Sequence, residues 1–125
     1  MPKRSRSATG NYRCILSDGA RAIRDAVHDD VELSRAIYSH VDTIAQKLGA
    51  DAADQVPFEK YARAAESLLK PSSAARAVVA GAPVIERVDL LVDLIARQLG
   101  MGNVAITQTV ETVDQALENN QYRAA

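Results

Sequence analysis

Carboxylates at helical spacing in the second half of the chain are the side chains best suited to binding metal ions. They form two sets at positions i, i+3 and i+7, namely Glu86, Asp89, Asp93 and Glu111, Asp114, Glu118. Inward-facing carboxylates of this kind hold two metal ions in di-iron helical bundles, which also use a Glu-x-x-His motif. No histidine follows His40, and the first set lies opposite an apolar stripe. We therefore expect these carboxylates to face water, and we predict no metal site and no cofactor.

The other reactive side chains do not form a recognisable catalytic motif. His28 followed by the acidic residues of 29–32 superficially looks like a ligand cluster, but a histidine ending one helix and an aspartate capping the next explain it locally. Cys14 follows Arg13 with no base beside it, so we expect a small buried side chain. The chain has no phosphate-binding glycine loop, nucleophile elbow or dinucleotide fingerprint. We predict a non-enzymatic protein with no small-molecule substrate.

Base recognition is the chemistry that residues 93–106, DLIARQLGMGNVAI, suggest. A glycine between two helices, with apolar residues that hold the second helix against the first, is typical of a helix-turn-helix. The segment resembles the DNA-binding helix-turn-helix over about 20 residues, although Thr109 stands where that motif has an aliphatic residue. If residues 93–110 read DNA, the candidate contacts are Arg97, Thr107, Gln108 and Thr109.

The charge of the second helix of this motif opposes DNA binding. Residues 103–120 contain no lysine or arginine and do contain Glu111, Asp114 and Glu118. Affinity for DNA depends largely on basic side chains that release counterions from the phosphates. We therefore favour a hairpin that packs in the core, and we keep a small DNA-binding regulator as the alternative function.

The beginning of the chain is basic, whereas the rest is acidic. Four basic residues precede the first acidic one, Asp18, and the remainder has 11 basic and 16 acidic side chains. Basic arms of this kind contact phosphates or acidic proteins. We expect residues 1–16 to form a flexible arm and residues 17–125 to form a single domain. The predicted contacts to nucleic acid or an acidic partner are Lys3, Arg4, Arg6 and Arg13.

The apolar pattern predicts an all-α fold, a compact bundle of five or six helices without a strand series. The expected boundary residues are Ser17, Asp29 with Glu32, Gly49, Pro57, Pro71, Ser72 or Ser73, Gly81, Pro83, Leu99, Gly100 and Asn103. The expected core residues of the longer helices are Leu33, Ile37, Val41, Ile44, Leu48, Phe58, Tyr61, Ala65, Leu68, Leu69, Val84, Val88, Leu91, Val92, Ile95, Leu99, Ile106, Val110, Val113 and Leu117.

A short internal repeat lies within this pattern. VDTIAQKLG at 41–49 and VDLIARQLG at 92–100 are identical at six of nine positions, which suggests two copies of one helical hairpin. The apolar runs at 33–48 and 84–99, with Leu90 and Leu94 on an exposed flank, offer more apolar surface than one small bundle needs. We therefore predict a homo-oligomer.

These observations favour a self-assembling structural or adaptor protein, of the kind found in virus particles or nucleoprotein complexes. Its basic arm would contact nucleic acid or an acidic partner, and its helices would contact other copies of the chain. The single cysteine excludes an internal disulfide framework, and no apolar run is long enough to span a bilayer. We expect the protein in the cytoplasm or within a virus-like assembly, without membrane association.

Overall fold

The computed structural model describes residues 7–51 and 56–124, and within them the chain is mainly helical with one small two-stranded sheet. The elements in chain order are η1 (Ser7–Asn11), η2 (Tyr12–Cys14), β1 (Ile15–Leu16), β2 (Gly19–Ala20), α2 (Ile23–His28), α3 (Val31–Lys47), α4 (Phe58–Ala65), α5 (Ser73–Val79), α6 (Val88–Gln98) and α7 (Val104–Ala124). The predicted helical class is confirmed. The antiparallel hairpin was not predicted, because strands of two residues are too short to show alternation. None of the described helices is both long and apolar enough to span a bilayer.

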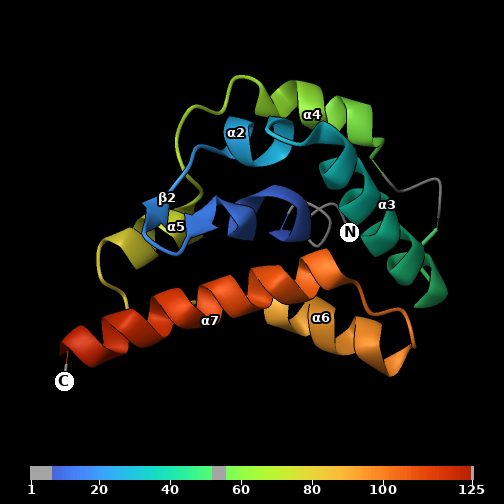
Figure 1. Cartoon of the computed structure of the whole chain (residues 1–125). Coiled ribbons are helices and arrows are strands. Elements are labelled where there is room, and N and C mark those ends of the chain that lie inside the picture. Colours follow the sequence, from blue (N-terminus) through green and yellow to red (C-terminus); the bar gives the residue numbers. More distant parts are fainter. Residues whose placement is uncertain (1–6, 52–55, 125) are drawn as a thin grey trace.

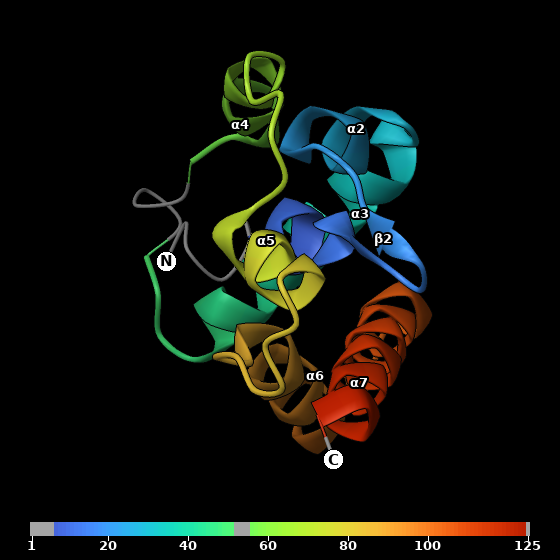
Figure 2. The same ribbon diagram turned by 90° about the vertical axis from the view of Figure 1, so that its left-hand side faces the viewer.

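The N-terminal segment from Thr9 to Ile15 lies in the middle of the structure. In Figure 1 the elements η1 and η2 lie between a layer formed by α2, α3 and α4 and a second layer formed by α6 and α7. Figure 2 shows the same layers from the side, with α5 in front of the central segment. Thr9, Tyr12, Cys14 and Ile15 are all buried.

For the described residues, this position differs from the flexible arm that the sequence predicts over residues 1–16. Residues 9–15 of that arm are buried or half-buried, and η1 contacts α2, α3 and α6. The remaining basic residues of the predicted arm, Lys3, Arg4 and Arg6, lie outside the described residues.

Polar side chains satisfy the irregular backbone of this central segment. Ser72 donates from its hydroxyl to the Asn11 carbonyl at 2.6 Å. The Tyr12 hydroxyl donates to the Glu86 carbonyl and accepts a hydrogen bond from the Val88 amide at 3.2 Å. A buried backbone group without a partner costs about as much free energy as a lost hydrogen bond. These hydrogen bonds therefore offset the cost of burying the central segment.

Local sequence signals placed several helix ends correctly. Ser72 caps α5 by accepting from the Ala75 amide at 3.2 Å. Asn103 caps α7, since its side-chain oxygen accepts from the amides of Ala105 and Ile106. Gly49 and Gly100 follow α3 and α6 in the left-handed region, with φ of 103° and 68°. The two copies of the repeat therefore end alike.

Other boundaries differ from the prediction. Asp30, and not Asp29, caps α3 by accepting from the Leu33 amide at 3.1 Å. Ser17 lies in the turn of the hairpin, and the first α-helix begins at Ile23. The helix expected from Pro83 begins only at Val88, and α4 ends at Ala65, well before Pro71. Several predicted core residues are exposed, namely Leu33, Leu48, Leu68, Leu69, Val84, Leu91 and Leu99.

An aromatic cluster fixes the place of the central segment against α3 and α4. Tyr38 stacks on Tyr61 with ring centroids 5.4 Å apart. Gly10 lies against this cluster, and a Cβ atom added there would overlap the Tyr61 hydroxyl and approach Val27 Cγ2 at 3.2 Å. A glycine is therefore needed at position 10 for close approach.

We predict that Gly10→Ala lowers the free energy of unfolding by about 1–3 kcal/mol, because the added methyl group overpacks this contact. Urea denaturation measures the change. Gly19→Ala is the matched control, since no atom lies within 4 Å of a Cβ at position 19, and it should change stability by less than about 1 kcal/mol. Equal effects of the two substitutions would contradict the close approach of Gly10 to Tyr61.

Candidate functional site

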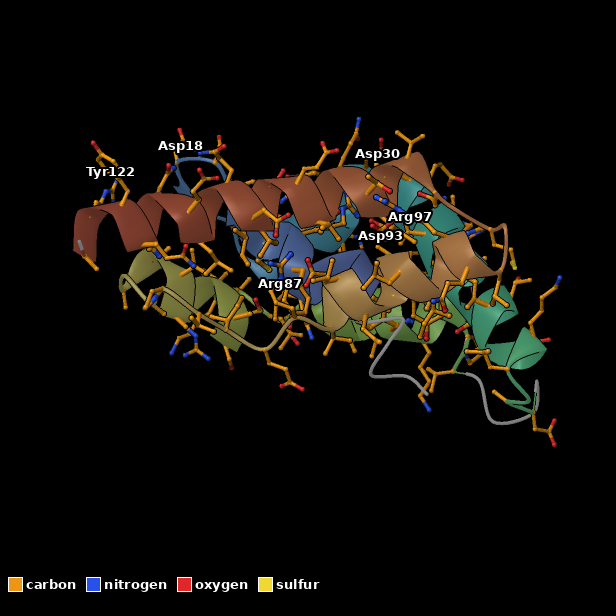
Figure 3. The ribbon with its side chains drawn as sticks, turned by 90° about the horizontal axis from the view of Figure 1, so that it is seen from below. Asp18, Asp30, Arg87, Asp93, Arg97 and Tyr122 are labelled. Carbon is orange, nitrogen blue, oxygen red and sulfur yellow. The ribbon has the colours of Figure 1, made fainter. Side chains whose placement is uncertain are left out.

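Two of the four residues predicted to read DNA are held by one buried carboxylate. Asp93, on α6, accepts from the Thr107 hydroxyl at 2.8 Å through one oxygen. Its other oxygen pairs with Arg97 Nη2 at 3.0 Å. Figure 3 shows Asp93 and Arg97 beside each other where α6 meets α7. The Thr107 hydrogen bond therefore links α7 to α6, whereas the Arg97 ion pair lies within α6.

The other two residues of that set lie near a residue of the basic set. Gln108 is exposed on α7, and the Thr109 hydroxyl donates to the Ala105 carbonyl within the same helix at 2.9 Å. Both residues line a groove of about 420 Å³ that Arg13 also lines. The fold thus brings together Arg13, Gln108 and Thr109, which we had assigned to different functions.

The carboxylates of α6 are buried, which contradicts our expectation that they face water. Asp89 and Asp93 are each 1% exposed. Arg87 binds both oxygens of Asp89, with Nε and Nη2 each 3.0 Å away, and binds Asp114 on α7 through Nη1 at 2.7 Å. Burial by itself lowers the pKa of Arg87, but its hydrogen bonds to Asp89 and Asp114 outweigh this effect and raise it. No group of three or more potential metal ligands occurs in the part of the chain that the structure describes.

Because its carboxylates point inward, α6 presents apolar side chains outward. Leu91 and Leu94 are each 49% exposed, and Leu90 and Ile95 are half-buried beside them. At the carboxyl end of the helix, Ile95 lines a small apolar depression with residues of the repeated segments, Val41, Ile44, Ala45, Leu48 and Val92. The buried face of α6 combines Asp89 and Asp93 with Val92 and Ala96, while Leu91 and Leu94 face outward. Exposed leucines of this kind are suited to contact with another protein.

The histidines and the cysteine have structural environments. His28 Nε2 donates to the Ala62 carbonyl at 2.7 Å, and His40 Nε2 donates to the Met101 carbonyl at 2.6 Å. Cys14 is fully buried, as expected, and burial raises the pKa of its thiol. The raised pKa disfavours the reactive thiolate.

Sequence reasoning missed Arg87 and misplaced Asp89 and Asp93. The spacing of Asp93 and Arg97 at i, i+4 is a signal for an ion pair on one helix, and it was present in the sequence. Helical spacing gives no such signal for the partner of Asp89, because Arg87 precedes α6 and also contacts Asp114 on α7.

We predict that Asp89→Ala lowers the free energy of unfolding by about 3–5 kcal/mol, because it leaves the half-buried Arg87 without its main partner. Asp114→Ala removes the exposed partner of the same arginine and should cost about 1 kcal/mol or less. Thermal and urea denaturation compare the two variants. If both substitutions have equally small effects, the Arg87–Asp89 pair does not hold α6 in place.

The described residues therefore provide an outward apolar surface on α6 and a groove with a cationic side chain. Comparisons with protein families, with curated proteins and with solved structures find no match to this chain.

Proposed function

We propose that this protein is a non-enzymatic structural or adaptor protein that self-associates through the outer face of α6. The observation that supports this proposal is the placement of side chains on α6, which buries Asp89 and Asp93 and leaves Leu91 and Leu94 exposed on one side. Burying carboxylates is costly unless they are paired, whereas exposed leucines give no benefit to an isolated chain. A second copy of α6 would cover these leucines and remove their side chains from water.

The spacing of the exposed leucines suits pairing about a two-fold axis. In an antiparallel pair of α6 helices, Leu91 of one copy packs on Leu94 of the other, and the same contact occurs twice. The Arg97 end of one helix then approaches the Glu86 end of its partner, which places opposite charges at the rim. Each leucine that becomes buried adds about 1 kcal/mol or more to the association.

A second exposed apolar pair supports assembly beyond a dimer. Leu68 and Leu69 lie in the connection between α4 and α5, and Leu69 is 63% exposed. Figure 1 places this connection and α6 on opposite sides of the structure. Two separate apolar surfaces allow each copy to contact two neighbours, as in the virus-like or nucleoprotein assemblies suggested by the sequence.

The basic start of the chain is proposed to contact nucleic acid or an acidic partner. The residues concerned are Lys3, Arg4 and Arg6, and the proposal for them rests on the sequence. Arg13 has a different environment, since its guanidinium donates into the core to the Thr9 carbonyl and to the Ser34 hydroxyl.

The alternative is a small DNA-binding regulator that uses the α6–α7 hairpin. The exposed position of Gln108 in the first turns of α7 favours it. The contacts of Arg97 and Thr107 with Asp93 count against it, because the carboxylate already engages the Thr107 hydroxyl and offsets the charge of Arg97.

We predict that the purified protein is oligomeric and that Leu94→Glu reduces its mass to that of a smaller species. A buried charge at the centre of the interface would be unpaired, which should weaken association by at least about tenfold. Light scattering coupled to size-exclusion chromatography gives the masses. Tyr122→Glu is the matched control, because Tyr122 is 84% exposed near the end of α7. A monomeric wild-type protein would contradict the proposal, as would an unchanged mass for Leu94→Glu.

We further predict that the triple variant Lys3→Gln, Arg4→Gln, Arg6→Gln binds duplexes of any sequence much more weakly than the wild type does. Three fewer phosphate contacts should also make the affinity less dependent on salt, with a slope lower by about 3. The control carries the same charge change on exposed lysines of the body, Lys47, Lys60 and Lys70. Fluorescence anisotropy measures the affinity of each variant and its dependence on salt. If binding instead selects one duplex and is lost in Gln108→Ala, the regulator is the correct function.

A further inference from the structure

A groove with a positively charged corner lies between the β1–β2 hairpin and the first turns of α7. Its volume is about 420 Å³, and it is open to solvent on one side. The lining residues that matter for its chemistry are Arg13 and Arg21 from the N-terminal part, Leu33 from α3, and Gln108, Thr109 and Thr112 from α7. This groove does not include the outer leucines of α6, so it is independent of the proposed subunit contact.

Arg13 is a half-buried cation without an anionic partner among the described residues. Its Nη1 donates to the Thr9 carbonyl at 3.1 Å and to the Ser34 hydroxyl at 3.0 Å, and both acceptors are neutral. Its Nε and Nη2 make no hydrogen bond within the part of the chain described, and neither atom is fully buried. That edge of the guanidinium is therefore accessible to solvent. Charged groups removed from water are usually paired with an opposite charge, and here the partner is missing.

A second arginine is held beside the first. Arg21 Nε donates to the Arg13 carbonyl at 2.9 Å, and the Arg21 amide donates to the Cys14 carbonyl at 2.9 Å. Asp29 pairs with Arg21 Nη1 at 3.3 Å from an exposed position. Burial lowers the pKa of Arg13, and the nearby charge of Arg21 lowers it further, while Asp30 acts in the opposite direction. The Arg13 guanidinium stays charged at neutral pH, as arginine does in proteins.

We propose that this groove binds a phosphate group, either as free phosphate or as the terminal phosphate of a small organic molecule. The free Nε–Nη2 edge of Arg13 matches two oxygens of a phosphate in a bidentate contact, and Arg21 supplies a second positive charge. The exposed amide of Gln108 provides a further donor from the opposite wall. Leu33 offers an apolar contact to an organic portion, and the volume of the groove is that of a small-ligand site.

The acidic side chains near the groove restrict where an anion can lie. Asp18, in the turn between β1 and β2, is exposed and lines the groove on the side of the hairpin. Asp29 and Asp30 lie outside the lining, although Asp30 is near enough to act on the charge of Arg13. A bound phosphate is therefore expected on the Arg13 and Gln108 side, away from Asp18.

The test is a titration of the full-length protein with inorganic phosphate and, separately, with adenosine monophosphate at low ionic strength. Nuclear magnetic resonance follows the Nε–H signals of the arginines, and calorimetry measures affinity. Saturable binding that shifts the Arg13 signal supports the proposal. Equal affinities identify phosphate itself as the recognised group, and tighter binding of the nucleotide shows that the walls add contacts to the organic portion.

Substitutions assign the binding to this groove. Arg21→Gln should weaken phosphate binding by at least about tenfold, since one charge-assisted hydrogen bond is lost. Arg13→Lys keeps the charge but loses the bidentate edge, and it should weaken binding by a similar factor while circular dichroism shows a folded protein. Arg63→Gln, at an exposed position of α4, is the control for net charge and should bind as the wild type does.

The proposal is overturned if neither ligand shifts the Arg13 signal, or if Arg21→Gln and Arg13→Lys both bind phosphate as tightly as the wild type. The triple glutamine variant at Lys3, Arg4 and Arg6 separates this site from the basic start of the chain. It should retain phosphate binding in the groove. Loss of phosphate binding in that variant would assign the anion to the N-terminal residues and would also overturn the groove.

Discussion

The structure depends on the burial of an irregular segment, Thr9 to Ile15, whose polar groups must find partners away from water. Ser34 and Ser72 each supply a hydroxyl to it, one through Arg13 and the other directly to the Asn11 carbonyl. The Tyr12 hydroxyl in turn satisfies backbone groups at the start of α6. These partners come from the starts of α5 and α6 and from α3. The hydrogen bonds that satisfy the polar groups of the segment therefore also fix the helices around it.

The orientation of α6 follows from a second set of buried polar contacts. Arg87 and Thr107 bind Asp89 and Asp93 where α6 meets α7, so the carboxylates turn inward. Its sequence has apolar residues on more than one side, and periodicity alone wrongly placed Leu91 inside and the carboxylates outside. The caps at Ser72 and Asn103 could be predicted because a cap depends on residues within one helical turn. The inner face of α6 could not, because it is set by partners that are distant in the sequence.

The difference between local and distant contacts also explains why the sequence did not show that Arg13 and Gln108 are neighbours. Charge counting placed Arg13 in a basic arm, since the apolar run that follows it is too short to show periodicity. The structure makes Arg13 part of the core and brings it to one groove with Gln108, a residue singled out for a different reason. The sequence therefore contained both residue types, and only the path of the central segment through the fold shows that they are neighbours.

Separating Arg13 from Lys3, Arg4 and Arg6 also changes how the positive charge of the chain can act. Arg13 has a fixed position, so it can recognise the shape of a small anion through the geometry of its guanidinium edge. Charges that act only through counterion release recognise a polyanion by its charge density and lose affinity steeply as salt rises. Binding in the groove should depend on which arginine edge is present, whereas binding by the first residues should depend on how many charges remain. The two modes are therefore distinguishable in one protein.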